Sequence, residues 1–160
     1  MQTTIQYCPI TQIAAPLFNV ASPFSGKVHP LTQHPEALFA TSLLGQGVVV
    51  EHNGPLMVSP FDGEIEAIKR CGSEWIVRNQ HIRCLLNLHL PDLYLSPEYL
   101  KLQRVNLGPV ALGEPLLRLD LPSDIKPIAA VVILKPYSFS ACYYPLKQVR
   151  AGKDPLLTVT

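Results

Sequence analysis

The sequence is short of charge and has no long hydrophobic run. Only 16% of its 160 residues are charged and the formal net charge is +1, so a nucleic-acid surface built on basic excess is excluded. The apolar stretch from Ile13 to Val20 is broken by Pro16 and Asn19, and no basic segment precedes it. We therefore predict neither a signal peptide nor a membrane insertion, and expect a cytoplasmic protein.

Closely spaced cysteines are also absent. Cys8, Cys71, Cys84 and Cys142 lie far apart, without the short spacing that metal sites and redox dithiols require. We expect four reduced thiols, no metal site and no cofactor. The hydrophobic fraction of 48% argues against disorder, and 160 residues suit a single domain with one core.

Proline and glycine are plentiful, at 16 and 9 residues, and are spread along the chain. This distribution indicates many short elements separated by turns, which predicts an all-β fold: an antiparallel β-sandwich or a partly closed barrel. The predicted strands are Gly26 to His29, Gly47 to Glu51, Leu56 to Val58, Gly63 to Lys69, Glu74 to Arg78, Ile82 to Leu90, Leu116 to Leu121, Ala130 to Leu134, Phe139 to Tyr144 and Leu156 to Val159.

One short helix is predicted from Glu36 to Leu44. Pro35 suits its first turn, Glu36 complements the helix dipole and Gly45 supplies a C-terminal stop. A second helical turn is expected to begin at Ser96, because serine caps a helix and Pro97 fits just inside its start.

The chain contains an internal duplication. SPFSGKVHPL, which begins at Ser22, matches SPFDGEIEAI, which begins at Ser59. GEPLLRL from Gly113 is echoed by GKDPLLTV from Gly152. The spacing is too irregular for a solenoid, so we expect two interleaved strand-and-turn repeats within one core.

The segment HIRCLLNLHL, from His81 to Leu90, has the period of a strand. Alternation places Ile82 and every second residue up to Leu90 in the core, and places His89 on the opposite, mixed face near the strand end. Such a strand can aim an imidazole at a partner. A half-buried histidine bonded to backbone remains the alternative that this pattern leaves open.

Several consecutive segments together resemble the glucose-type enzyme IIA domain of the sugar phosphotransferase system. SPFSGKVHPL, HPEALFATSLLGQGVVV and LMVSPFDGEI are similar, in order, to that family's APxSGxV, VPDxxFAxxxxGDGxAI and APVDGxI segments. LLNLHLPDLYL places His89 at the position of the family's signature histidine, and VALGEPLLRLDL resembles its VxxGDxLLEFDL. The likeness divides the chain into an N-terminal extension, 1–16, and an enzyme IIA-like domain, 17–160.

The resemblance implies a phosphocarrier. His89 would accept a phosphoryl group from the histidine-containing phosphocarrier protein and pass it to the IIB domain of a sugar transporter; regulatory target proteins are further expected partners. A neutral imidazole suits this chemistry, because its ordinary pKa near 6.5 leaves a nucleophilic fraction at neutral pH.

The sequence departs from the family pattern at the family's second histidine. Ser73 stands at that position in an ungapped comparison, and a shift by one residue places Glu74 there. A serine can donate a hydrogen bond but carries no positive charge. A degenerate regulatory binding module, which keeps the fold without efficient phosphoryl transfer, is therefore the alternative function.

The remaining candidates are secondary. His81 adjoins a turn and is either a substitute donor or a solvated loop residue, whereas His29, His34 and His52 are interpreted as surface residues. Phe39 and Leu43 form either the apolar rim that a partner touches or simple core packing. Zinc peptidases and biotinyl or lipoyl carriers share the duplicated motif, but the chain has no His-x-His pair and no lysine in the best hairpin match, Gly108 to Leu117.

Overall fold

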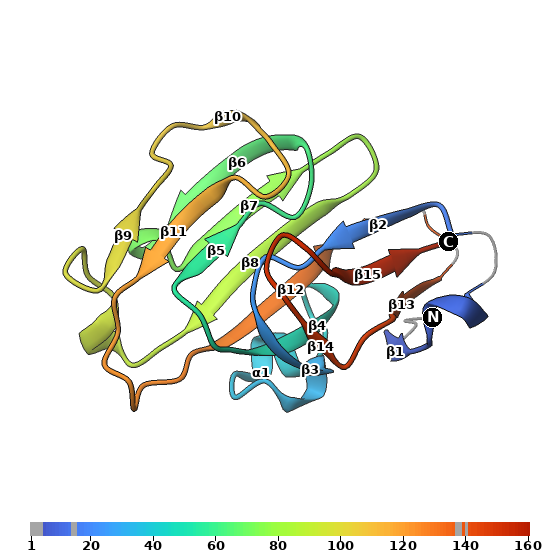
Figure 1. Cartoon of the computed structure of the whole chain (residues 1–160), viewed down its shortest axis with the longest axis horizontal. Helices are drawn as coiled ribbons and strands as arrows, with labels where there is room; N and C mark the ends of the chain where they lie inside the picture. The colour runs from blue at the N-terminus through green and yellow to red at the C-terminus, as the bar shows by residue number, and fades with distance from the viewer. Residues whose placement is uncertain (1–4, 14–15, 137–138, 140) are drawn as a thin grey trace.

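The computed structural model consists mainly of short strands (Figure 1). It describes residues 5–13, 16–136, 139 and 141–160. The helical elements of this part are α1 (Ala37–Ala40) and the 3-10 turns η1 (Ile10–Gln12), η2 (Leu31–Gln33), η3 (Arg70–Gly72) and η4 (Asp92–Tyr94). The strands are β1 (Gln6–Tyr7), β2 (Phe18–Ala21), β3 (Gly26–Pro30), β4 (Gly45–His52), β5 (Leu56–Val58), β6 (Gly63–Lys69), β7 (Glu74–Arg78), β8 (Arg83–His89), β9 (Leu100–Leu102), β10 (Gly108–Val110), β11 (Pro115–Leu119), β12 (Ile128–Leu134), β13 (Cys142–Tyr144), β14 (Gln148–Val149) and β15 (Pro155–Val159). The all-β prediction is confirmed.

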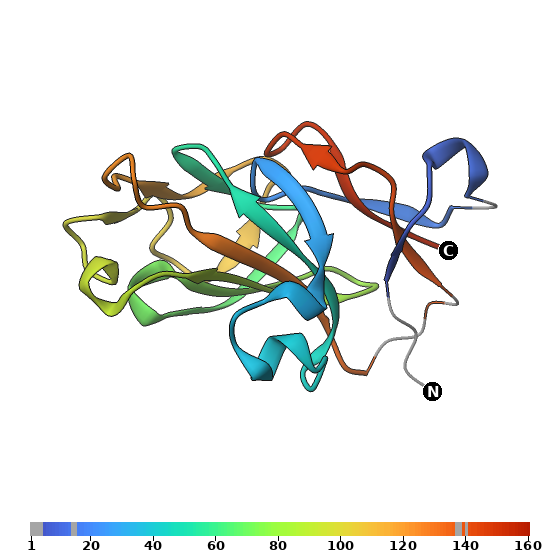
Figure 2. The ribbon, with the colours of Figure 1, turned by 90° about the horizontal axis from the view of Figure 1, so that it is seen from below.

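Three sheets build the part of the fold that the structure describes. An eight-stranded sheet has the order β10-β6-β7-β8-β12-β4-β3-β14, and two smaller sheets have the orders β1-β13-β15-β2 and β5-β11-β9. Their strand pairs are antiparallel, apart from the parallel pair of β1 and β13. The two smaller sheets lie over one face of the large sheet, and α1 lies against its other face (Figure 2).

The duplicated motifs form reciprocal hydrogen bonds, which confirms that they are interleaved. The Ala21 N–H donates to the Pro60 carbonyl and the Val58 N–H to the Pro23 carbonyl, both at 3.0 Å. Each Ser-Pro-Phe segment also holds one of the two glycine turns: Gly152 N–H donates to the Ser22 carbonyl and Gly113 N–H to the Ser59 carbonyl. The two sequence echoes are therefore two halves of one supersecondary unit, arranged in the same way twice.

The glycine that follows each Ser-Pro-Phe motif allows two strands to approach closely. A Cβ on Gly26 would lie 1.8 Å from the Glu51 carbonyl oxygen, and a Cβ on Gly63 would lie 2.1 Å from the Arg78 carbonyl oxygen. Gly26 also has a φ of +149°, a conformation that other residues rarely adopt. Any side chain at these two positions would push neighbouring strands apart.

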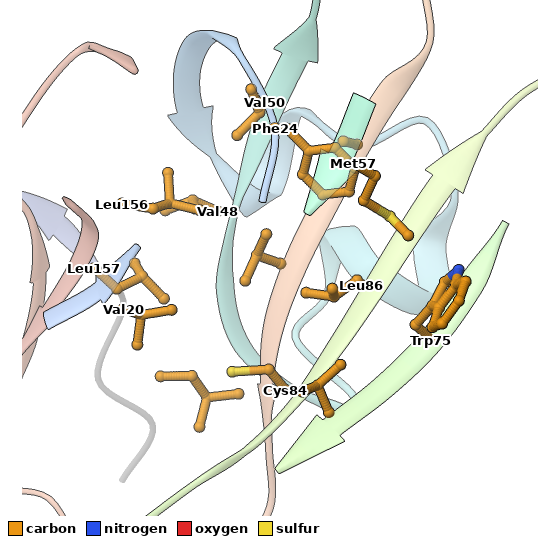
Figure 3. Packing of buried hydrophobic residues seen from close by; sticks show 14 of the residues in the cluster. Val20, Phe24, Val48, Val50, Met57, Trp75, Cys84, Leu86, Leu156 and Leu157 are labelled. Atoms are coloured by element: carbon orange, nitrogen blue, oxygen red, sulfur yellow. The ribbon is translucent and has the colours of Figure 1, made fainter. Parts of the chain in front are cut away.

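The main core lies between the large sheet and the two smaller ones (Figure 3). Trp75 and Leu86 enter it from β7 and β8, and Leu116 and Leu157 enter it from β11 and β15; all four are completely buried. A second, smaller cluster covers the outer face of the large sheet beneath η2 and α1. It contains Leu31, Phe39, Val49, Leu85, Ala130 and Val132. Neighbouring residues of β8 therefore pack into different cores.

The predicted helix is the main correction to the fold. α1 spans only Ala37–Ala40, instead of Glu36 to Leu44. Ser42 adopts a left-handed φ of +58°, and its N–H donates a hydrogen bond to the Phe39 carbonyl. This turn ends the helix before Gly45. Ser96 begins a turn, closed by hydrogen bonds from the Tyr99 and Leu100 N–H groups to its carbonyl.

The predicted strands correspond to strands of the structure, and the described residues contain five further short strands. Leu56 to Val58, Gly63 to Lys69 and Glu74 to Arg78 match their strands, and the others differ at their ends. The prediction from Phe139 to Tyr144 includes Ser140, which lies outside the described residues; the described strand there is β13. The strands β1, β2, β9, β10 and β14 were not predicted.

The N-terminal segment pairs with the four-stranded sheet β1-β13-β15-β2. β1 pairs with β13, and the Cys8 N–H donates to the Tyr144 carbonyl at 3.2 Å. Ile5 is buried in the main core. Residues 1–4 and 14–15 of the predicted extension lie outside the described part. The four cysteines are free thiols, as predicted.

Candidate functional site

His89 ends β8, a strand that is held on both sides. Ile128 of β12 is its register partner, and β7 pairs along the other edge of β8. The predicted alternation is confirmed, because Cys84, Leu86 and Leu88 are buried in the main core. The His89 side chain is 35% exposed. An imidazole on a fixed central strand thus reaches solvent on the outer face of the large sheet.

Glu36 contacts this imidazole from a segment distant in sequence. Its Oε1 lies 3.1 Å from His89 Nδ1. Glu36 immediately precedes α1 and has an extended backbone, with φ −96° and ψ 130°. Pro35, with its restricted backbone, joins Glu36 to His34, which caps the C-terminus of η2. The carboxylate is therefore presented to His89 by a tightly constrained connection.

This contact determines which nitrogen of His89 is available for chemistry. An ionised carboxylate only accepts hydrogen bonds, so Nδ1 is the nitrogen that carries the proton. The neutral ring then has an unprotonated Nε2, whose lone pair is available to act as a nucleophile. A carboxylate on the opposite nitrogen also fixes the ring orientation and stabilises the positive charge that develops when Nε2 forms a bond.

A second imidazole lies beside the first. The rings of His34 and His89 have centroids 5.6 Å apart and are arranged edge to face. His34 is 4% exposed, packs on the Phe39 ring, and accepts a 3.0 Å hydrogen bond at Nδ1 from the Glu36 N–H. Burial lowers the pKa of His34, and His89 lowers it further, against the opposing effect of Glu36. His34 is therefore neutral at neutral pH.

Ser73 adjoins the same end of β8, but its hydroxyl already has a partner. The Ser73 carbonyl accepts a hydrogen bond from the Leu88 N–H at 2.8 Å, which places its backbone beside Leu88, the residue before His89. Its Oγ donates to the Arg70 carbonyl at 2.8 Å, and the residue is 2% exposed. The hydroxyl closes the η3 turn, in which Arg70 and Cys71 have positive φ.

The two residues predicted as a partner surface differ in exposure. Phe39 is buried in the smaller cluster, in agreement with the core-packing alternative and not with an exposed rim. Leu43 is 66% exposed. Leu38 of α1 and Leu93 of η4 are also exposed, on segments that directly follow Glu36 and His89 in the chain. The apolar surface of these segments thus includes Leu38, Leu43 and Leu93.

The other histidines were only partly predicted. The interpretation of His34 and His52 as surface residues is wrong, since both are almost completely buried. Their side chains cover apolar residues, His34 at Phe39 and His52 at Phe24, where a ring of intermediate polarity can pack. His29 is partly buried and lies 3.3 Å from Glu51 Oε2. His81 is exposed in a turn closed by the Asn79 side chain, as the loop alternative predicted.

Sequence reasoning therefore missed two residues of the site, His34 and Glu36. Glu36 was interpreted only as a helix-dipole residue, although HPEALFA carries its acidic group at the position of the aspartate in the family's VPDxxFA segment. That shared acidic group was a usable signal. For His34 there was none, because its burial depends on how η2 folds over the sheet.

Among the described residues, no group of three or more histidine, cysteine, aspartate or glutamate side chains is arranged to hold a metal ion. Within the same part of the chain, no helix is long and apolar enough to cross a membrane.

Comparison with known proteins agrees with this geometry. The model of the family described as "phosphoenolpyruvate-dependent sugar phosphotransferase system, EIIA 1" matches residues 18–134. The glucose-specific EIIBCA component of Corynebacterium glutamicum is 28% identical over 108 residues, which are 67% of this chain and 16% of that protein. The glucose-specific EIIA component of Oceanobacillus iheyensis is 26% identical over 103 residues, 64% of this chain and 62% of that protein. In both cases the chain spans less than two thirds of the relative.

A solved structure shows the same fold. Glucose permease IIA from Mycoplasma capricolum superposes with a TM-score of 0.70 at 14% sequence identity, over 88% of this chain and 94% of that one. At this identity the likeness concerns the fold alone, and it confirms the predicted antiparallel β-sandwich.

Proposed function

This chain belongs to the EIIA 1 family of the phosphoenolpyruvate-dependent sugar phosphotransferase system, and on that premise we propose that it carries a phosphoryl group on His89. The observation that supports this assignment is the 3.1 Å contact between Glu36 Oε1 and His89 Nδ1. It leaves Nε2 of a partly exposed ring as an unprotonated nucleophile. Neither the family match nor the relatives favour the alternative of a binding module without transfer.

The donor in this proposal is the phosphohistidine of the histidine-containing phosphocarrier protein. The lone pair of His89 Nε2 forms a bond to phosphorus while the phosphorus–nitrogen bond of the donor breaks, and the electrons of that bond return to the donor imidazole. The Nδ1 proton stays on His89, where the Glu36 carboxylate stabilises the positive charge of the phosphorylated ring. No net charge is created, so positioning provides most of the catalysis.

The acceptor is the IIB domain of a sugar transporter, which takes the phosphoryl group from His89 by the same chemistry in reverse order. Both partners must approach the exposed side of the ring. Leu38, Leu43 and Leu93 offer apolar contact area on the segments beside Glu36 and His89. Such a surface excludes water when a partner docks, which strengthens the electrostatic interactions of the transferring group. We place these reactions in the cytoplasm.

A transfer experiment tests the proposal. The chain is incubated with radiolabelled phosphoenolpyruvate, enzyme I and the histidine-containing phosphocarrier protein, and a IIB domain is added afterwards. We expect label on the wild type, none on His89→Ala, and loss of label when the IIB domain is present. Label that enters and is not released to a IIB domain would favour the regulatory alternative. No label on the wild type with partners from the same organism would refute the proposal.

A further inference from the structure

His34 has a buried donor atom without a partner. Its Nε2 is inaccessible to solvent, and no hydrogen bond to it occurs within the described part of the chain. Buried polar groups in folded proteins are nearly always hydrogen-bonded, and exceptions require an explanation. A site that is completed only when a ligand or chemical group arrives is one such explanation.

The local hydrogen bonds define the chemical character of this atom. His34 Nδ1 accepts the Glu36 backbone N–H at 3.0 Å, so Nδ1 is the unprotonated nitrogen of the neutral ring. The proton of the neutral ring is therefore on Nε2, which is a donor. What is missing at this position is an acceptor.

The residue beside His34 that could bring an acceptor to it is His89. The His34 and His89 ring centroids are 5.6 Å apart, and within the described part of the chain no hydrogen bond joins the two rings directly. A phosphoryl group on His89 Nε2 adds a phosphorus atom and three strongly accepting oxygens beyond the ring. It would bring acceptor oxygens toward the neighbouring His34 ring, whose Nε2 donor has no partner within the described part of the chain.

We propose that the His34 Nε2–H donates a hydrogen bond to a phosphoryl oxygen on His89, and so stabilises the group during transfer. This inference rests on the proposed function of His89. It assigns a catalytic role to a residue of the η2–α1 connection, since His34 would touch the transferring group itself. The group-transfer step is the one given above, with no proton leaving His34.

The same cluster explains why Ser73 does not supply this donor. Its hydroxyl proton is used in the bond to the Arg70 carbonyl, which closes the η3 turn. The Arg70 carbonyl accepts both the Ser73 hydroxyl and the Ser73 N–H, so turning the hydroxyl toward a phosphoryl group would break one of the two hydrogen bonds that close this turn. His34 has no competing bond at Nε2, and a Glu36 backbone bond holds its ring.

Two amide variants, each of which replaces one ring nitrogen, separate the donor from the structural role of the ring. In His34→Asn the side-chain oxygen can replace Nδ1 as the acceptor for the Glu36 N–H, but the side chain is too short to replace Nε2. In His34→Gln the amide nitrogen can reach the Nε2 position, but the Glu36 N–H loses its acceptor. The exposed His81→Asn is the matched control for loss of a histidine.

The measurement is the rate at which His89 is phosphorylated by phosphoramidate, a small donor that needs no protein partner. We expect His34→Asn to lower the rate roughly ten- to hundredfold, the effect of losing a hydrogen bond to a charged group. His34→Gln should recover a large part of that loss, and His81→Asn should match the wild type. A wild-type rate in His34→Asn, or an equal loss in both His34 variants, would overturn the inference.

Nuclear magnetic resonance provides a test that needs no variant. On phosphorylation of the wild type, the His34 Nε2–H signal should move to the chemical shift of a proton bound to an acceptor and exchange more slowly with water. An unchanged His34 signal would contradict the inference while leaving phosphorylation of His89 intact. A wild type that takes no phosphoryl group at His89 would instead remove the proposed function, and this inference with it.

Discussion

The buried His52 should make the stability of the chain depend on pH. His52 ends β4, is 2% exposed and accepts the Ser25 N–H at Nδ1 with a 3.2 Å bond. Burial lowers the pKa of this imidazole to about 4, against weaker opposing hydrogen bonds with the Gly54 and Ser25 backbone. The unfolded chain has an ordinary histidine pKa of about 6.5. The folded chain therefore keeps His52 neutral in a pH range where the unfolded chain protonates it.

The sign and the magnitude follow from linkage. A folded pKa below the unfolded pKa means that the unfolded state binds more protons, so stability falls as the pH falls. The contribution of His52 is complete above about pH 6.5 and is lost between about pH 6.5 and about pH 4. A difference of about 2.5 pKa units corresponds to a loss of about 3 kcal/mol in the free energy of unfolding.

The assay compares the wild type with His52→Asn by urea unfolding at about pH 7.5 and about pH 4.5, where most of the loss has occurred. The asparagine oxygen can still accept the Ser25 N–H but cannot be protonated. We expect the wild type to lose about 2 to 3 kcal/mol more than the variant over this interval. The comparison cancels the contributions of His34 and of the carboxyl groups. Equal losses in the two proteins would refute the account of His52.

Three further perturbations have defined outcomes. Glu36→Gln should lower kcat/KM for phosphorylation of His89 roughly tenfold, because a neutral amide stabilises the phosphorylated ring less than a carboxylate does; an unchanged kcat/KM would show that the 3.1 Å contact has no role. Leu43→Asp should raise KM for the phosphocarrier protein and leave Tm unchanged, since this exposed side chain packs in neither core; a wild-type KM would exclude it from the docking surface. Leu86→Ala should destabilise the fold by about 2 to 5 kcal/mol in urea unfolding, because Leu86 is completely buried on a central strand, and a loss below about 1 kcal/mol would contradict the assigned packing.

Much of the fold could be predicted from local sequence patterns. Strict alternation from Ile82 to Leu90 correctly separated the core face of β8 from its outer face. The Ser-Pro-Phe repeat predicted an interleaved duplication, and the hydrogen bonds between Ala21, Pro23, Val58 and Pro60 form that duplication. These features depend on residues close together in sequence or on repeated motifs, which a sequence displays directly.

The missed elements are short or contain proline. β1 and β14 have two residues each, and β10 has three with a proline at its centre, so none is long enough to show a repeated alternation. The helix was extended too far because Gly45 was taken as its stop signal, whereas Ser42 ends it with a positive φ. Serine rarely adopts that conformation, so the pattern contained no sign of it.

The site was only half predictable for a different reason. His89 was predicted from its strand position and its motif. Its partner Glu36 is 53 residues earlier in the chain, and the contact exists because η2 and α1 pack on the outer face of the large sheet. His34 was assigned to the surface because it lies near the start of the predicted helix. Its burial against Phe39 is a tertiary property that no local pattern encodes.

The most direct test is to locate the phosphoryl group itself. The chain is labelled with 15N-histidine, phosphorylated through phosphoenolpyruvate, enzyme I and the phosphocarrier protein, and observed by nuclear magnetic resonance, with peptide mapping at neutral pH to identify the modified residue. We predict one phosphoryl group, bonded to Nε2 of His89, with Nδ1 still protonated opposite Glu36. A phosphoryl group on Nδ1, or on another residue, would contradict the central claim.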